Sequence, residues 1–423
     1  MRIYHRGLLL FILTLNISCS KDNVKDNGTT VKLDEKIEIY NAEKIDNSYV
    51  FAIENGSQNA YILNKEGFKV KEWNFDLRLG NDVEILPNGE LIAMFKQNIS
   101  PITIGGAGGI IRILNSDGST KWEYTCADNF KVGHHDLELL PNGNVLFQVW
   151  EKLTVIEALN YGIEVANDIF PEALYEINPI TNQLVWEWHS YDHVVQDTNN
   201  TLDNYGLINQ NPNRINFSYN NRVDGDIMHA NGIDYDEDKD VIYMSVNFYS
   251  EVWVIDHSTT TVEAATSSGG NYNKGGDLLY RFGNPTAYNH SFGERMFFNN
   301  HFPNLIEKEV PGKGNMLVYC NGTNINQSTV FELSLPQNFQ LSTTSSNEPQ
   351  IVWNFTDSNL FYDKISGAVR LKNGNTLITE GDYGYWEVTS NKEVVWKYFG
   401  QNKPFWRGYA YDLDDPAIIS LGL

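Results

Sequence analysis

The chain has 423 residues, of which 41% are hydrophobic and 13% aromatic, with 33 glycines. This composition, together with the scarcity of long helical patterns, is typical of a globular, β-rich protein. The formal net charge of −23 excludes the basic face that nucleic acid requires, so no nucleic-acid partner is expected. An anionic substrate would have to be attracted by local groups against the overall field.

The N-terminus has the pattern of a targeting segment. Arg2, His5 and Arg6 precede an apolar run over residues 7–15, which is too short to cross a bilayer as a stable helix. The next residues, Leu-Asn-Ile-Ser-Cys ending at Cys19, resemble the lipobox of bacterial lipoproteins, which implies that Cys19 carries lipid. A plain secretory signal with a chance cysteine is the alternative.

We therefore expect a lipoprotein signal peptide over residues 1–18, a tether over 19–45 and one domain over 46–423. The first part of the tether resembles that of surface-directed lipoproteins. The expected location is the cell envelope, lipid-anchored to the outer membrane and either periplasmic or surface-exposed. Cys126 and Cys320 fall in different repeats, and both a disulfide and two buried free thiols fit the sequence.

The remainder of the chain reads as a repeat. One part of each unit is an outer strand that ends in an aromatic pair, at Trp73, Trp122, Trp186, Tyr280, Trp353 and Trp396. The other part is an inner strand, a turn that is often Asn-Gly, and a second strand. Asn-Gly between alternating apolar runs is the strongest short-range signal for a hairpin. The sixth inner strand is expected from the N-terminal segment SYVFAIENGSQNAYIL.

Six units of four short strands predict an all-β fold, a six-bladed β-propeller closed by N- and C-terminal strands. Closure also removes exposed sheet edges. Few helices are expected, and residues 152–170 are one possible helix. Residues 190–222 form a long insertion in the middle of the chain, which is interpreted as a lid or cap loop. The aromatic residues of the outer strands are expected to pack between blades.

The innermost strands of a propeller begin near its axis on one face. Alignment of the turns brings five polar residues to this position: Asn81, His135, His229, His301 and Ser366. Because three of them are histidines, from nine in the whole chain, we expect the chemistry where these three side chains gather. His134 is an alternative to His135, since adjacent residues of a strand face opposite sides.

Three convergent histidines fit more than one kind of site. They are the ligand set of a catalytic zinc, but the three come from separate units and form no H-x-x-x-H pair among themselves, and neither a metal nor a cofactor is expected. They also fit polar residues that fill a propeller channel for structural reasons. The third interpretation is a nucleophile with two helpers.

Several segments resemble the arylsulfotransferases, in order over roughly residues 130 to 400: EWHSYDHVVQD, MHANGIDYDEDKDVIYMSVNFYSEVWVIDHSTTT, GGDLLYRFGNP, NNH followed by GKGNMLVYCNG, and ISGAVRLKNGNTLITEG. The resemblance implies a six-bladed β-propeller and a ping-pong reaction without a nucleotide sulfate donor. In that reaction a histidine attacks the sulfur of an aryl sulfate and holds the sulfuryl group as sulfohistidine. A phenol then takes the group.

The resemblance makes His301 the nucleophile, with His135 and His229 as binders of sulfuryl oxygens and as acid–base partners. Neutral imidazole is a good nucleophile at neutral pH, and fixed donors stabilise the charge that develops. The chain departs from the family pattern at two positions. Phe302 stands where the family commonly has an aspartate after the nucleophile, and Asn247 stands where well-studied members have an arginine.

The expected function is therefore an aryl-sulfate sulfotransferase that takes a small aryl sulfate donor and a phenol acceptor. Asn247, Asn300, Arg281 and His134 are the candidate substrate-binding residues, and Arg295 is a further candidate cation. The alternative is a non-catalytic surface propeller that binds a phenolic or sulfated glycan ligand. A third hypothesis is metal-dependent hydrolysis at the three histidines.

Overall fold

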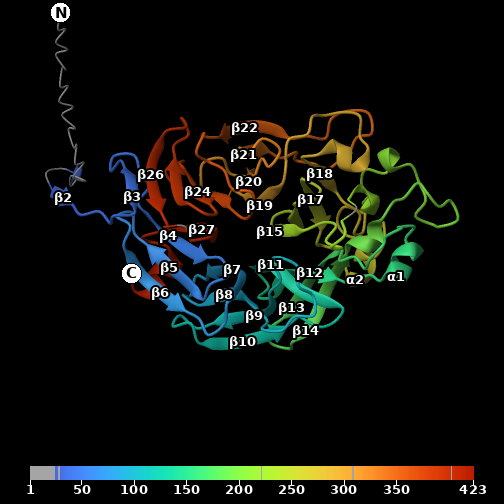
Figure 1. Cartoon of the computed structure of the whole chain (residues 1–423), viewed down its shortest axis with the longest axis horizontal. Helices are drawn as coiled ribbons and strands as arrows, with labels where there is room; N and C mark the ends of the chain where they lie inside the picture. The colour runs from blue at the N-terminus through green and yellow to red at the C-terminus, as the bar shows by residue number, and fades with distance from the viewer. Residues whose placement is uncertain (1–23, 27–28, 221, 307–308, 402) are drawn as a thin grey trace, which may run out of the picture.

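The computed structural model describes residues 24–26, 29–220, 222–306, 309–401 and 403–423. The predicted signal peptide and Cys19 lie outside these residues. Figure 1 shows β-sheets set side by side around a central region, an all-β, propeller-like arrangement. In the described part of the chain, no helix combines the length and the apolar character needed to cross a membrane.

The largest sheet has eight strands in the order β10-β9-β8-β7-β11-β12-β13-β14. Their bounds are β7 Leu79–Ile85, β8 Leu91–Lys96, β9 Gly109–Leu114, β10 Thr120–Thr125, β11 Lys131–Leu139, β12 Val145–Glu151, β13 Glu172–Asn178 and β14 Gln183–His189. Two antiparallel four-stranded arrays make up this sheet. They are joined by one parallel pair, His135 with Asn81. The strand that carries His135, β11, therefore lies beside the strand that carries Asn81, β7.

The other large sheets have the orders β15-β16-β17-β18, β19-β20-β21-β22, β23-β24-β25-β26-β3 and β27-β4-β5-β6, and β1 pairs with β2. Their bounds are β15 Ala230–Asp236, β16 Val241–Val246, β17 Glu251–Asp256, β18 Tyr280–Phe282, β19 Asn300–Leu305, β20 Asn315–Cys320, β21 Thr329–Ser334, β22 Gln350–Phe355, β23 Gly367–Arg370, β24 Thr376–Glu380, β25 Gly384–Val388, β26 Val394–Phe399, β3 Ile37–Tyr40, β27 Phe405–Asp412, β4 Ser48–Glu54, β5 Asn59–Leu63, β6 Lys69–Asn74, β1 Val24–Asp26 and β2 Thr29–Val31. The all-β, propeller-like fold is confirmed. The count of six blades stays a prediction, because two arrays are continuous in one sheet.

The last strand of the chain closes the structure. β27 pairs antiparallel with β4, so strands from the two ends of the chain share one sheet (Figure 1). The sequence prediction was wrong about which strand is innermost here. The segment SYVFAIE forms β4, in second place, whereas β27 lies at the inner end and packs against β7 and β23. Trp406 and Arg407 thereby reach the centre of the molecule.

Asn-Gly turns join the inner strands to their neighbours, as predicted. They lie between β7 and β8, β11 and β12, and β23 and β24. The glycines Gly89, Gly143 and Gly374 have φ of 79°, 82° and 90°, a left-handed conformation that a Cβ disfavours. Local turn chemistry therefore sets the register of these hairpins.

The outer aromatic residues link each array to the next, which confirms their predicted packing role. The indole nitrogens of Trp73, Trp122, Trp186, Trp353 and Trp396 donate respectively to Ser116 O, Asn182 Oδ1, Thr259 Oγ1, Ser390 O and Lys65 O. The Tyr280 hydroxyl donates to Asn347 O. Each bond joins the fourth strand of one array to a loop of its neighbour, and the bond to Lys65 closes the series.

Helices are short. They are α1 Val155–Asn160, α2 Thr261–Ala264, α3 Pro416–Leu421 and the 3₁₀ segments η1 Ser190–His193, η2 Ile208–Gln210, η3 Phe217–Tyr219 and η4 Pro285–Tyr288. The helix expected in 152–170 is thus the short helix α1, which has six residues. The insertion is fixed at His193, whose ring nitrogens lie 2.9 Å from Asp277 Oδ1 and 2.8 Å from Ala264 O.

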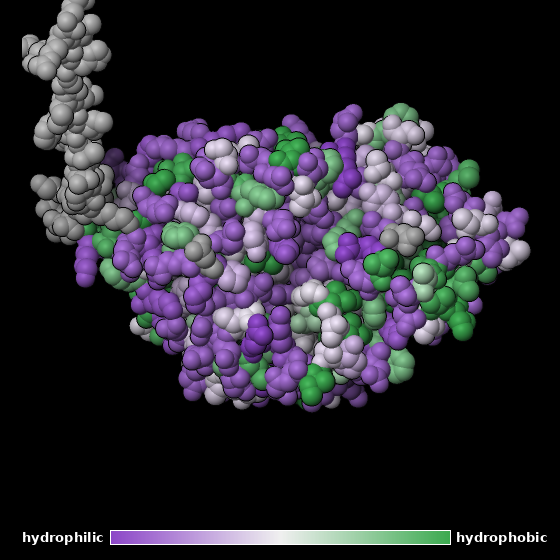
Figure 2. All heavy atoms as spheres, viewed as in Figure 1, coloured by the Kyte–Doolittle hydropathy of each residue, from purple (hydrophilic) through white to green (hydrophobic). Residues whose placement is uncertain are grey.

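The face shown in Figure 2 is mainly hydrophilic, in keeping with the acidic composition. Apolar residues gather most toward the end of the molecule where Figure 1 places α1. There, α1 exposes Ile156 and Leu159. Cys126 and Cys320 are both buried, and both are free thiols with no disulfide between them.

Candidate functional site

The starts of the inner strands share an unusual backbone conformation. The residues with left-handed φ at these starts are Asn81, His135, His229, Phe302 and Ser366. A non-glycine residue in this region is strained and usually persists where the surrounding structure imposes it. Four of these residues belong to the predicted alignment; at the fifth strand the left-handed residue is Phe302, with φ of 52°, directly after His301.

The three predicted histidines nevertheless come together. The ring centroids of His135 and His229 are 4.8 Å apart. Trp406 of β27 connects the group, with its ring 5.7 Å from that of His135 and 6.3 Å from that of His301. His135 and His301 are buried, and His229 is partly exposed. Three separate sheets thus deliver one cluster.

His301 is held by an asparagine that the sequence analysis missed. Its Nδ1 lies 2.7 Å from Oδ1 of Asn321. The amide orientation of Asn321 is fixed, because its Nδ2 donates to the backbone carbonyls of Tyr362 at 2.9 Å and Ile365 at 3.2 Å. Oδ1 can only accept, so Nδ1 of His301 must carry the proton. The lone pair of the imidazole is therefore on Nε2.

His229 has an acidic partner within the same loop. Its Nδ1 lies 2.5 Å from Oδ2 of Asp226, and its ring stacks on Phe248 with centroids 4.7 Å apart. A carboxylate at Nδ1 fixes the tautomer of a histidine. The orientation of the His229 ring is therefore set by a residue of its own loop.

His135 is enclosed from two sides. Its Nδ1 lies 2.9 Å from Nδ1 of His134, which is fully buried behind it. On the other side the backbone of Gly106 covers the ring, since a Cβ built at Gly106 would lie 2.0 Å from Cε1 of His135. Only glycine allows the loop before β9 to approach the ring this closely.

The three rings follow one plan. Each uses Nδ1 for a protein partner, respectively His134, Asp226 and Asn321. Among the described residues, no hydrogen bond of the protein involves the Nε2 of His135, His229 or His301. This arrangement leaves three Nε2 atoms for a bound molecule.

A buried arginine from β27 lies beneath the cluster. Arg407 forms a bidentate ion pair with Asp136, in which both nitrogen–oxygen distances are 2.8 Å. Its guanidinium lies 4.0 Å from the ring centroid of Phe302, which explains how the chain accommodates an aromatic residue after His301. Asp136 is thus the carboxylate that balances the charge of Arg407 in the core.

Burial decides the protonation of the two enclosed histidines. It lowers the pKa of His301 to about 3, against an upward effect of Asn321 and helped by the charges of His229 and Arg407. Burial, then His229 and His134, also lowers the pKa of His135 well below its usual range. Both imidazoles are therefore neutral at neutral pH, as a nitrogen nucleophile requires.

The predicted substrate-binding residues divide into two groups. Asn247 reaches the site, with its Nδ2 3.1 Å from Asn300 O and 3.4 Å from Nδ1 of His301. The side chain of Asn300 instead donates to Ser245 and to the backbone of Glu251. Arg281 lies in the outer strand β18, where Glu251 is its ion-pair partner. Its place in β18 separates Arg281 from the histidine cluster.

Arg295 also hydrogen-bonds elsewhere, to the carbonyl of Phe297 and the hydroxyl of Ser250.

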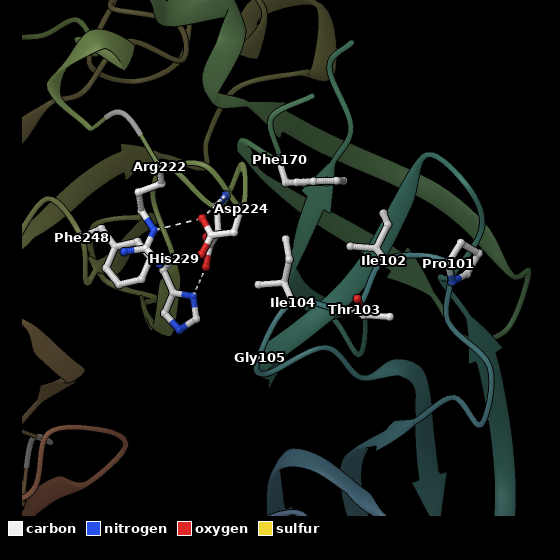
Figure 3. Close-up of a pocket in the computed structure, with 11 residues that line it drawn as sticks. Pro101, Ile102, Thr103, Ile104, Gly105, Phe170, Arg222, Asp224, His229 and Phe248 are labelled. Carbon is white, nitrogen blue, oxygen red and sulfur yellow. Dashed lines mark hydrogen bonds and ion pairs between the residues drawn. The ribbon is translucent and has the colours of Figure 1, made fainter. Parts of the chain in front are cut away.

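A cavity of about 410 Å³ opens beside His229 (Figure 3). One wall is mainly apolar and the other polar, and the lining consists of Pro101, Ile102, Thr103, Ile104, Gly105, Phe170, Arg222, Asp224, Asp226, His229 and Phe248.

Arg222 is the cation of this cavity, and it comes from the end of the insertion. Its guanidinium lies over the ring of Phe248 at 4.0 Å and pairs with Asp224 at 2.6 Å (Figure 3). Sequence reasoning treated the insertion only as a lid. Within the described residues, no three histidine, cysteine or acidic side chains are grouped to hold a metal ion.

Comparisons with known proteins agree with the resemblance found in the sequence. A family model described as arylsulfotransferase (ASST) matches residues 25–403. No curated protein matches the chain.

Solved structures with a similar fold include a protein of unknown function from Bacteroides caccae, with 14% identity, a TM-score of 0.49 and coverage of 86% of this chain and 98% of that one. The WD40 domain of Toxoplasma gondii coronin gives 8% identity, a TM-score of 0.41 and coverage of 86% and 74%. The β-propeller domain of Myceliophteria thermophila Cps50 (Swd1) gives 8% identity, a TM-score of 0.39 and coverage of 90% of this chain and 94% of that one.

Proposed function

The chain belongs to the arylsulfotransferase family, and on this premise we propose that it transfers a sulfuryl group from an aryl sulfate ester to a phenol without a nucleotide sulfate donor. Membership of the family indicates an aryl sulfotransferase that acts on small aromatic molecules. The observation that carries the finer proposal is the tautomer of His301, which Asn321 fixes with Nδ1 protonated and Nε2 free.

In the first half-reaction, Nε2 of His301 attacks the sulfur of the donor. The bond from sulfur to the aryl oxygen breaks, the phenolate leaves, and the sulfuryl group is held on Nε2 as sulfohistidine. The imidazole gains positive charge as the new bond forms. Oδ1 of Asn321, 2.7 Å from Nδ1, stabilises that charge without moving.

In the second half-reaction, the oxygen of an acceptor phenol attacks the same sulfur and the bond from sulfur to nitrogen breaks. The acceptor must lose its proton and the first phenolate must gain one. His135 and His229 are the acid–base partners, because each presents an uncommitted Nε2 and their rings are 4.8 Å apart. The ping-pong order follows from the single nucleophile.

The cavity beside His229 is the proposed place for the aryl group. Phe248, Phe170 and Ile104 supply apolar contacts, and the volume of about 410 Å³ suits a small aromatic ester. Arg222 lies at the polar wall and supplies the local positive charge that an anionic donor needs on a protein of net charge −23. Asn247, which stands where the family has an arginine, gives only a neutral donor near His301.

The test is the release of nitrophenolate from p-nitrophenyl sulfate, with and without phenol, by the wild type and by His301→Ala. We expect release that depends on acceptor in the wild type and is lost in the variant. His290→Ala is the matched control, since His290 lies in a loop where its Nε2 contacts only Ser345 O. Release that persists in His301→Ala contradicts the assigned nucleophile. Aryl sulfate or sulfated glycan binding without any turnover contradicts the transferase and favours the binding propeller.

Two finer features complete the proposal. We propose six blades, because six outer aromatic residues each bond to a loop of the next array. We also propose that lipid on Cys19 anchors the protein to the outer membrane, which rests on the sequence alone. Cys19→Ser should then move the protein from the membrane fraction to the soluble fraction.

A further inference from the structure

A line of buried polar groups runs behind His135. Glu172 Oε2 of β13 lies 2.8 Å from Nε2 of His134, and Nδ1 of His134 lies 2.9 Å from Nδ1 of His135. Glu172 and His134 are fully buried. The assigned reaction does not use Glu172 or His134, and neither touches the cavity.

This line is held rigidly. The indole of Trp150 stacks on the His134 ring, with centroids 3.8 Å apart and planes at 8°. The same indole donates to Oε1 of Glu172 at 2.9 Å, and the backbone N–H of Ala230 donates to that oxygen at 2.7 Å. Oε1 therefore accepts two hydrogen bonds, and Oε2 is the oxygen that faces His134.

A close contact between two imidazole nitrogens must contain one proton, which leaves two arrangements. In the first, Glu172 is a carboxylate that accepts Nε2–H of His134, Nδ1 of His134 accepts Nδ1–H of His135, and Nε2 of His135 has a lone pair. In the second, Glu172 is a carboxylic acid, both contacts are reversed, and Nε2 of His135 carries a proton. The second arrangement holds one more proton.

We propose that Glu172 and His134 form a proton store for His135, so that the proton of the acceptor phenol is kept as a neutral carboxylic acid and never as a buried imidazolium. This inference rests on the proposed function. In the acceptor step the phenol O–H passes to Nε2 of His135, Nδ1–H of His135 passes to His134, and Nε2–H of His134 passes to Glu172. The phenolate oxygen bonds to sulfur as the sulfur–nitrogen bond of sulfo-His301 breaks. In the donor step the reverse transfers protonate the leaving phenolate.

The environment favours this distribution of charge. Burial lowers the pKa of His135 and of His134, and burial raises the pKa of Glu172 well above its usual range. The charged groups that face the line from other elements are Asp226, Asp136, His229, His301 and Arg407. An extra proton is therefore held more easily at the carboxylate than on either imidazole. Glu172 and His134 are positioning residues, because they act through His135.

The decisive variant is Glu172→Gln. The two N–H donors at Oε1 require the amide oxygen there, so the amide nitrogen takes the place of Oε2 and donates to His134. The variant is thereby fixed in the second arrangement, with Nε2 of His135 permanently protonated. We expect the donor step with p-nitrophenyl sulfate, whose leaving group needs no proton, to stay within about threefold of wild type. The acceptor step should slow by about 100-fold, the range of one acid–base group, and sulfo-enzyme should accumulate in the intact mass spectrum.

Glu176→Gln is the matched control. Glu176 lies on the same strand β13 and is also paired with a histidine, His257, at 3.0 Å, but outside the site. It should leave both half-reactions unchanged. Equal half-reactions in Glu172→Gln and wild type would overturn the proton store.

A second readout does not depend on activity. The ¹⁵N shifts of labelled histidine, followed as the pH rises, should show Nε2 of His135 losing its proton in the wild type and keeping it in Glu172→Gln. The same tautomer in both proteins overturns the inference, even if the wild type transfers no sulfuryl group and the proposed function fails. If Glu172→Gln does not fold, the rate of the wild-type acceptor step is measured in mixtures of light and heavy water. Transfer of three protons makes this rate depend on the deuterium fraction along a curve, and a linear dependence overturns the proton store.

Discussion

Oδ1 of Asn321 lies 2.7 Å from Nδ1 of His301 and fixes which nitrogen of that imidazole can attack. The two residues face each other across the β19–β20 hairpin, in which His301 pairs with Tyr319. Asn321 follows β20 directly and is itself fixed by two backbone carbonyls. The reactive tautomer is therefore a property of the fold and requires no charged partner.

Asn321→Ala should slow the donor step by about 100-fold, the usual effect of losing one preorganised contact of the transition state. It should also cost about 1–3 kcal/mol of unfolding free energy, because a buried group loses its partner. The nitrophenolate burst and urea unfolding measure the two effects. Asn347→Ala is the control, since Asn347 is also buried but holds the loop at Ser342. An unchanged burst in Asn321→Ala would contradict the orienting role.

Gly106→Ala should displace His135 and abolish most turnover. The new Cβ would lie 2.0 Å from the ring, and φ at Gly106 is 95°. Gly143→Ala controls for backbone strain alone, because Gly143 has φ of 82° but open space around its Cβ position. We expect Gly143→Ala to lose only about 1 kcal/mol of stability and no activity. Comparable activity loss in both variants would show that the clash with His135 is not the cause.

Arg222→Gln should raise KM for the aryl sulfate about tenfold with little change in kcat, since about 1.4 kcal/mol is a modest value for one contact to a charged group. The effect should shrink as salt is added, because the side chain is partly exposed. Lys121→Gln is the control, because Lys121 is an exposed cation that pairs with Glu90 and does not line the cavity. A fall in kcat at unchanged KM would place Arg222 in the transition state and not in donor capture.

Acid should destabilise the protein partly through His301. Burial lowers the pKa of His301 from 6.5 to about 3, so the unfolded chain binds a proton that the folded site refuses. This contribution to stability is complete above pH 6.5 and is lost as the pH falls toward 3. At pH 5 the loss is about 2 kcal/mol, from 1.4 kcal/mol per pKa unit. Urea unfolding at pH 7 and pH 5 should show a smaller difference for His301→Asn than for wild type. An identical difference would contradict the buried, neutral imidazole.

The amino-acid sequence by itself determined the repeating strands, the closure of the sheets by both chain ends and the grouping of three histidines. These features are local or periodic: Asn-Gly fixes a hairpin within a few residues, and the outer aromatic residues recur in every unit. Equivalent starts of equivalent strands then bring equivalent side chains to one centre. The prediction of the histidines needed only the alignment of the turns.

Only the tertiary structure decided which partners surround these histidines. Trp406 and Arg407 reach the centre because the last strand, and not the segment SYVFAIE, is innermost in the closing sheet. Arg407 meets Asp136 across 271 positions of the chain, and Glu172 meets His134 across 38. No local pattern encodes such contacts, because they form between strands that the closed sheet arrangement brings together. The tautomers and charges of the site, which control its chemistry, depend on these contacts.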